Sequence, residues 1–196
     1  MLAIVDKLDD PLVHHNTLCR LEDGRQASDF ANAVAFAKSV CSWLTDDVIQ
    51  SSIGQMGLTT TLPKVVARWV RRADRIPKNP VSTGDDDLVP LVTPRSLIQV
   101  GHRYRNCLSN KVEEVLAGRL AFAEFRTDAV VEFRPLTQGW IVWQVHGHRN
   151  ERATHAVETA ALARCDLMGI ARLDERPGGR EWQRYCRFTR PSDCSW

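Results

Sequence analysis

Three short apolar runs in the second half of the chain constrain its fold more than any other feature. They cover residues 120–126, 129–135 and 140–147, and stretches of two and four residues separate them. Connections this short join antiparallel neighbours, because parallel strands need a crossover of a dozen residues or more. The sequence therefore predicts a three-stranded antiparallel meander.

Helical patterns flank this meander. Thr93 can cap a helix that has Pro94 at its first position, and Thr154 can cap another that ends near Gly169. Earlier in the chain, helices are expected from Ser28 and after Thr45. We therefore expect an α+β fold: a helical N-terminal layer followed by a helix, a three-stranded antiparallel meander and a helix. The last helix is expected on the same face of the sheet as the helix after Thr93.

Composition suggests four segments. Residues 1–76 form a helical N-terminal region, 77–93 a linker or loop, 94–170 the α+β core, and 171–196 a basic-aromatic tail. Pro, Gly and Asp enrichment indicates the loop. Its run Asp85-Asp86-Asp87 has no partners at fixed offsets, so it is interpreted as a solvated loop without a metal.

Residues 64–76 form the most amphipathic stretch. Placed on a helix, its cations fall within an arc of about 100°, opposite an apolar side. These cations are Lys64, Arg68, Arg71, Arg72 and Arg75. A one-sided row of cations suits a nucleic-acid backbone. The alternative is a solvated face whose arginines pair with acids elsewhere in the fold.

The tail repeats basic chemistry with aromatic residues between the charges. Arg184 and Arg187 alternate there with Trp182, Tyr185 and Phe188. Such a pattern can stack bases while it contacts phosphates, so both arginines are candidate nucleic-acid contacts. The alternative is that the aromatic side chains dock on the core.

Polar residues recur at every second position of the predicted strands. If they align, one sheet face carries a polar patch able to bind a partner, continued beyond the third strand. Its members are Glu124, Glu132, Arg134, Gln144, His146 and Asn150. On the third strand, strict alternation puts Trp143 and Val145 on the face opposite Val142. The alternative is an ordinary water-facing side of an antiparallel sheet.

A catalytic arrangement is also conceivable around Cys107. Nucleophilic catalysis needs a thiolate, an imidazole and an orienting polar group within hydrogen-bond reach. Cys107 supplies the thiol, His146 or alternatively His102 or His148 the imidazole, and Gln144 or Asn150 the polar group. The alternative is that Cys107 packs as a small hydrophobe at the edge of an apolar stripe.

The central third of the chain carries a motif pattern. It consists of Asn106-Cys107, then Gly118 before the first strand, then Gln144-x-x-Gly147-x-x-Asn150. In this pattern the chain resembles PcfJ-like domain proteins. The resemblance implies an association with conjugative plasmids, phages and other bacterial mobile elements, and it implies no settled reaction.

The overall composition limits the remaining function classes. The formal charge is only +2, and the six cysteines show no C-x-x-C pair. No apolar run approaches the roughly 18 residues that span a bilayer. We expect a cytoplasmic protein without membrane partner, metal or cofactor.

The leading hypothesis is a non-catalytic accessory protein of a mobile element or phage that binds nucleic acid or a nucleoprotein complex through the arginine-rich helix face. Two alternatives stay open. One is a Cys- or His-dependent hydrolase or nuclease centred on Cys107 and His146, and the other is an inhibitor or adaptor that binds a protein partner.

Overall fold

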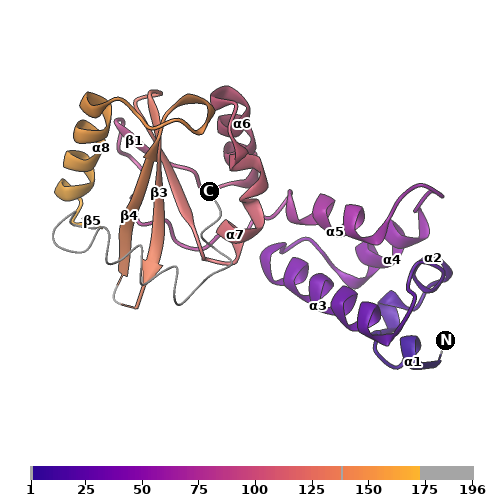
Figure 1. Ribbon diagram of the computed structural model, residues 1–196. Coiled ribbons are helices and arrows are strands. Elements are labelled where there is room, and N and C mark those ends of the chain that lie inside the picture. Colours follow the sequence, from indigo (N-terminus) through magenta and orange to yellow (C-terminus); the bar gives the residue numbers. More distant parts are fainter. Residues whose placement is uncertain (1, 138, 173–196) are drawn as a thin grey trace, which may run out of the picture.

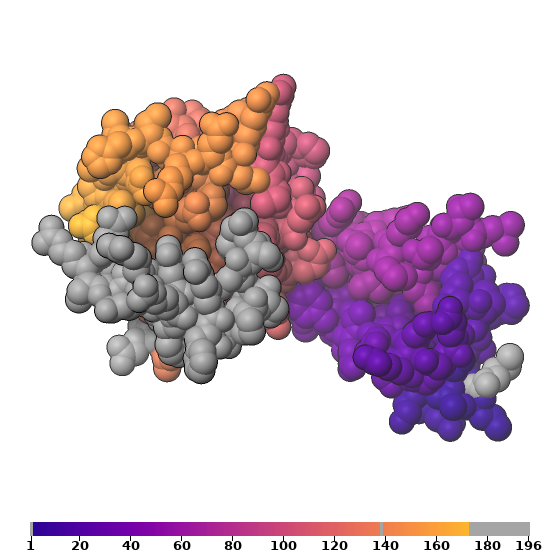
Figure 2. All heavy atoms as spheres, in the orientation of Figure 1, coloured from indigo at the N-terminus to yellow at the C-terminus, as the bar shows by residue number. Residues whose placement is uncertain are grey.

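The computed structural model describes residues 2–137 and 139–172, so the predicted tail with Arg184 and Arg187 lies outside the described residues. The predicted α+β class is confirmed, with helices beside a five-stranded, mostly antiparallel sheet. Figure 2 shows the N-terminal helical part as a lobe beside the α+β part.

The N-terminal lobe is built from short helices and one long one. They are α1 (Leu2–Val5), η1 (Asp10–Leu12), α2 (His15–Leu18), α3 (Gly24–Val40), α4 (Asp46–Gly54) and α5 (Leu62–Val70). The predicted helix start at Ser28 is too late, because the Asp23 side chain caps α3 by accepting from the Gln26 amide. The predicted Thr45 cap of α4 is confirmed.

Helix α5 ends six residues earlier than the predicted 64–76 helix, which corrects the idea of a single helix face with five cations. Past Val70 the chain is held by α3 instead: the amides of Asp74 and Arg75 both donate to the Val40 carbonyl. The Trp43 indole N–H donates to the Arg72 carbonyl, which a longer helix would have used internally. Arg72 and Arg75 therefore lie beyond the helix.

The segment 77–93, expected as a linker or loop, contains a strand. β1 (Leu88–Pro90) pairs antiparallel with β2 (Ala121–Phe125) at the edge of the sheet. Val81 and Leu88 are buried in the core beneath that edge. Prolines and aspartates masked this strand in the sequence, but an edge strand tolerates Pro90 because its outer side needs no amide donor.

The predicted meander is confirmed as β2, β3 (Ala129–Leu136) and β4 (Gly139–His146), and a short parallel strand β5 (Ala171–Arg172) adds to β4. The register shifts between Glu132 and Phe133, a β-bulge that leaves Trp143 without a partner. Val142 and Val145 consequently belong to the same core cluster, so the alternation predicted for the third strand is wrong.

Helices cover both faces of this sheet (Figure 1). α6 (Pro94–Tyr104), the turn η2 (Cys107–Asn110) and α7 (Val112–Leu116) lie on one face, and α8 (His155–Leu167) lies on the other. The last helix was predicted beside α6, which is wrong. The reason is composition: every residue of β2 is buried, so neither face of the sheet centre could be left in water.

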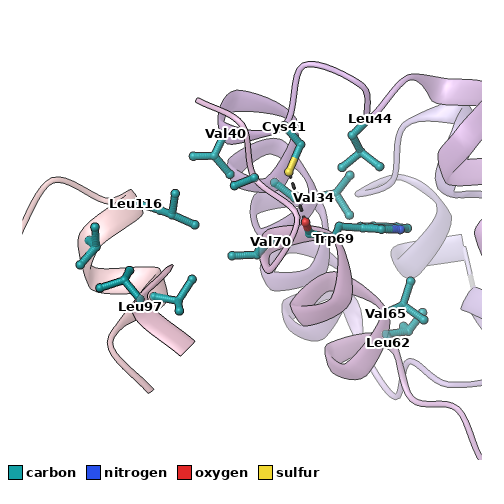
Figure 3. Packing of buried hydrophobic residues seen from close by; sticks show 14 of the residues in the cluster. Val34, Val40, Cys41, Leu44, Leu62, Val65, Trp69, Val70, Leu97 and Leu116 are labelled. Atoms are coloured by element: carbon teal, nitrogen blue, oxygen red, sulfur yellow. Dashed lines mark hydrogen bonds between the residues drawn. The ribbon is translucent and has the colours of Figure 1, made fainter. Parts of the chain in front are cut away.

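One core cluster joins the two lobes. It runs from the N-terminal helices to α6, α7 and the inward positions Phe122 and Val130 of the sheet. Figure 3 shows Val40 and Val70 facing Leu97 and Leu116 across the junction. Among the described residues, no helix combines the length and the apolar character that crossing a membrane requires.

Candidate nucleic-acid interface

Five exposed cations lie on α5 and the segment that follows it; we call them the basic surface. They are Lys64, Arg68, Arg71, Arg72 and Arg75. Lys64 and Arg68 are one helical turn apart, and Arg71 is the C-cap residue of the same helix. The opposite side of α5 buries Val65, Trp69 and Val70 in the core, which fixes the direction of the cations towards solvent.

No cation of the basic surface forms an ion pair with any acid of the described residues. The sequence explains this, since Asp74 is the one acid between residues 48 and 84. The Asp74 carboxylate accepts hydrogen bonds from the Ser42 amide and hydroxyl instead. These bonds hold the pKa of Asp74 below its ordinary value. Residues 64–75 therefore carry five cations and a single carboxylate, which Arg75 influences without forming an ion pair.

Arg72 differs from its four neighbours because it also has a structural contact. Its guanidinium lies 4.5 Å from the ring centroid of Trp43, a cation–π arrangement. Together with the Trp43 N–H bond to the Arg72 carbonyl, this contact holds the segment after α5 against the loop after α3. Arg72 is thus oriented but remains exposed.

Two further exposed cations extend this charge towards the sheet, and sequence reasoning missed them. Lys78 follows Pro77, and Arg119 follows Gly118, which has a left-handed φ of 69° and lies beside Pro77. Neither cation has an ion pair with a described residue. Arg119 is distant from α5 in the chain, so only the folded contact between residues 77 and 118 brings it near.

The strand register aligns most of the predicted polar sheet face, and its two carboxylates are buried, whereas Arg134, Gln144 and His146 are half-buried and Asn150 is exposed. Cross-strand pairs align Glu132 with Gln144, and Val130 with both Glu124 and His146. Glu132 and Glu124 are buried rather than water-facing. The ordinary wet-face alternative is therefore wrong for both carboxylates, and whether the polar residues bind a partner stays a prediction.

Glu132 is held by two neighbours on this face. Arg134 Nε donates to Oε1 at 2.9 Å, and His146 Nε2 lies 3.2 Å from Oε2. Burial alone would raise the pKa of Glu132, but the bonds from His146 and Arg134 outweigh burial and lower it. The ionised form of the carboxylate is therefore favoured, and in that form its oxygens can only accept hydrogen bonds.

Glu124 forms an ion pair with an arginine of helix α6. Arg103 on α6 reaches it with an Nη2–Oε2 distance of 2.5 Å. Burial, together with the Glu124 charge, raises the pKa of Tyr104 well above its ordinary value, which keeps this phenol protonated. Arg103 thus compensates a buried charge that would otherwise be costly.

Cys107 lies in η2 and is exposed, so its predicted packing role is wrong. The helix expected around it ends at Tyr104, because Arg105 turns left-handed at φ 50° and Asn106 caps the new turn. The Cys107 thiol donates to Asn150 Oδ1 at 3.8 Å, which joins two residues of the PcfJ-like pattern.

The described contacts do not assemble the predicted Cys–His pair. His146 bonds to Glu132, whereas Cys107 bonds to Asn150, so thiol and imidazole belong to two separate contacts. Among residues 2–137 and 139–172, no group of three or more His, Cys, Asp or Glu side chains could hold a metal ion.

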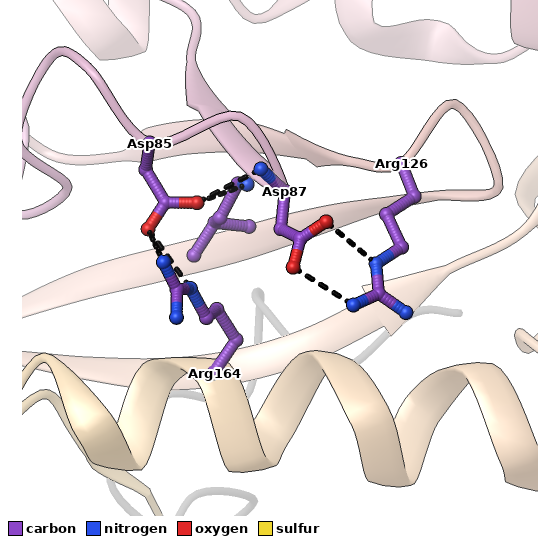
Figure 4. Close-up of polar contacts among 5 residues, drawn as sticks. Asp85, Asp87, Arg126 and Arg164 are labelled. Carbon is purple, nitrogen blue, oxygen red and sulfur yellow. Dashed lines mark hydrogen bonds and ion pairs between the residues drawn. The ribbon is translucent and has the colours of Figure 1, made fainter.

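The acidic run before β1 is not a solvated loop. The Asp85 carboxylate accepts two hydrogen bonds from Arg164 on α8, at 2.5 and 2.9 Å. The Asp87 carboxylate accepts one hydrogen bond from each of two guanidinium nitrogens of Arg126, both at 2.8 Å (Figure 4). Asp85 also accepts from two backbone amides. The Asp87–Arg126 pair is bidentate, whereas both Arg164 nitrogens donate to Oδ2 of Asp85. The two pairs fix the loop to the sheet edge and to α8.

No protein-family model, no curated protein and no solved structure matches the chain. The PcfJ-like resemblance therefore rests on its motif residues alone and stays a prediction.

Proposed function

We propose that the protein binds nucleic acid, or a nucleoprotein complex, through the basic surface and acts without catalysis as an accessory protein of a bacterial mobile element or phage. The mobile-element context rests on the PcfJ-like resemblance. The binding proposal rests on one observation: five exposed cations of one segment have no acidic partner among the described residues.

Free energy of binding would come from counterion release. Each phosphate that a cation neutralises releases condensed ions, which makes affinity fall as salt rises. Cations that already pair with a carboxylate within the fold contribute little to this effect. The unpaired state of Lys64, Arg68 and Arg71 therefore matters more than the total charge of the chain, which is only +2.

The test is charge reversal of two cations whose side chains form no hydrogen bond, ion pair or cation–π contact with a described residue. We expect Arg68→Glu/Arg71→Glu to lose at least about a hundredfold in affinity for nucleic acid at ~0.1 M salt. Fluorescence anisotropy with labelled DNA and RNA measures this loss, and circular dichroism checks that the variant stays folded.

Lys7→Glu/Arg25→Glu is the matched control because it changes the charge by the same amount elsewhere. Both residues are exposed, and Arg25 lies about 22 Å along α3 from Val40, where Arg75 is attached. The control should bind almost as the wild type does. Equal losses in both variants, or no binding by the wild type at low salt, would refute the proposed function.

A further inference from the structure

We infer that the basic surface recognises double-stranded DNA through its phosphates and prefers it to single strands and to double-stranded RNA. This inference rests on the proposed function and specifies its ligand. The evidence is the set of side chains that surround the cations, together with the dimensions of α5.

The basic surface offers no freely exposed Phe or Trp ring for base stacking. Residues 2–92 contain four such side chains, namely Phe30, Phe36, Trp43 and Trp69, and the exposed imidazoles His14 and His15 lie at the start of α2 rather than on α5. Phe30 and Trp69 are buried, Phe36 packs on the core, and Arg72 lies over the half-buried ring of Trp43. Proteins that hold single strands combine a basic groove with aromatic side chains on which successive bases stack. On α5 and the segment after it, charge is present without such exposed rings.

The surface also lacks the amides that read base edges. Residues 56–78 contain no Asn and no Gln, and the exposed positions of α5 are Pro63, Lys64 and Arg68, followed by Arg71 at its cap. Asn and Gln are the side chains that recognise adenine, and Arg and Lys contact either guanine or the phosphates. Because no adenine-reading side chain is present, we assign the contacts of this surface to the backbone.

A surface that contacts only phosphates favours a duplex for an electrostatic reason. A duplex carries one charge per ~1.7 Å of axis, twice the density of one strand, and releases about 0.9 rather than about 0.7 counterions per neutralised phosphate. Over five contacts the difference amounts to roughly one counterion. At ~0.1 M salt this corresponds to about a tenfold preference for the duplex.

The width of helix α5 favours a DNA duplex over an RNA duplex. An α-helix with its side chains is about 10–12 Å across, and the major groove of B-DNA is about 12 Å wide. α5 can thus lie at the mouth of that groove, with Lys64 and Arg68 reaching phosphates on its rims. The major groove of double-stranded RNA is deep and narrow and does not admit a helix.

Anisotropy titrations of the full chain test the inference with one labelled DNA strand of about 20 nucleotides, roughly two helical turns as a duplex. The strand is used alone, annealed to its complement, and replaced by an RNA duplex of the same sequence. Arg68→Glu/Arg71→Glu and Lys7→Glu/Arg25→Glu are measured in parallel. We expect the DNA duplex to bind about tenfold more tightly than the single strand and more tightly than the RNA duplex, and only the first variant to lose this binding.

The outcomes separate the inference from the proposed function. If the single strand or the RNA duplex binds as tightly as the DNA duplex, and Arg68→Glu/Arg71→Glu still loses binding, the ligand inference is wrong and the proposed function stands. If no nucleic acid binds, or both variants lose binding equally, both are wrong.

Discussion

Four arginines of the α+β lobe and the arginines of the basic surface do different things. In the α+β lobe Arg103, Arg126, Arg134 and Arg164 each pair with a carboxylate of the same lobe, and three of those carboxylates are largely buried. On the basic surface the same residue type has no acidic partner within the described residues. The difference teaches that the supply of nearby acids, rather than the number of arginines, decides which ones are free to bind a ligand.

The largest effects should come from two double variants, one that removes arginine charge from the basic surface and one that removes it from the α+β lobe. Arg68→Gln/Arg71→Gln should lower duplex DNA affinity about 60-fold at ~0.1 M salt, because two phosphate contacts are lost, while the melting temperature stays unchanged. Arg126→Gln/Arg164→Gln should leave duplex DNA affinity unchanged and lower the melting temperature, because Asp85 and Asp87 lose their partners. Anisotropy and thermal melts measure both. If the second variant weakens DNA binding while it stays folded, the two sets of arginines are not distinct.

The next effect concerns the stability of the paired lobe. Glu132→Gln should lower the free energy of unfolding by about 2 kcal/mol, because two hydrogen bonds to a buried carboxylate lose their charge. The melting temperature should fall by roughly 4–8 °C. DNA affinity should not change.

The Glu132→Gln variant also tests how the free energy of unfolding depends on pH. The pKa of Glu132 is lowered on folding, so its stabilisation is complete above the ordinary glutamate pKa and is lost as pH falls through the lower, folded pKa. Urea denaturation across acidic pH should therefore show a shallower decline for Glu132→Gln than for the wild type. Parallel declines would mean that the bonds from His146 and Arg134 do not stabilise the ionised form.

A smaller effect should follow from giving the basic surface an acid. Ala67 lies on α5 three residues after Lys64 and four residues before Arg71, so Ala67→Glu places a carboxylate among the cations. We expect DNA affinity to fall roughly tenfold, the equivalent of one phosphate contact. Ala67→Gln is the control for the added bulk, and an equal loss in both would contradict the electrostatic explanation.

The smallest effect is expected at Cys107. Its thiol is exposed and bonds weakly to Asn150, so Cys107→Ala should change DNA affinity less than about twofold and stability by less than about 0.5 kcal/mol. Anisotropy and urea denaturation measure both. A strong loss of function in a folded Cys107→Ala protein would instead favour the enzyme hypothesis.

Local signals in the sequence were sufficient for several elements. Thr93 and Pro94 predicted the start of α6, Thr45 that of α4, and the short connections the meander. These elements are decided by neighbouring residues, namely a capping side chain or a turn of fixed length, so a single sequence contains the necessary information.

The errors arose where distant residues decide. α5 ends where it does because the Val40 carbonyl, thirty residues earlier, accepts the amides of Asp74 and Arg75. Glu124 resembled a water-facing strand residue because its partner Arg103 lies on another element. The bulge at Trp143 changes the alternation without any local sign. For the same reason, the sequence could indicate exposed cations, whereas only the structure could show that they have no acidic partner among the described residues.

The salt dependence of DNA binding tests the central claim most directly, because its slope counts phosphate contacts independently of absolute affinity. For the wild type we predict that log K falls with log salt with a slope of about −4.5, given five contacts of about 0.9 each. For Arg68→Gln/Arg71→Gln we predict a slope of about −2.7. An unchanged slope in that variant would contradict the claim that these arginines contact the nucleic acid.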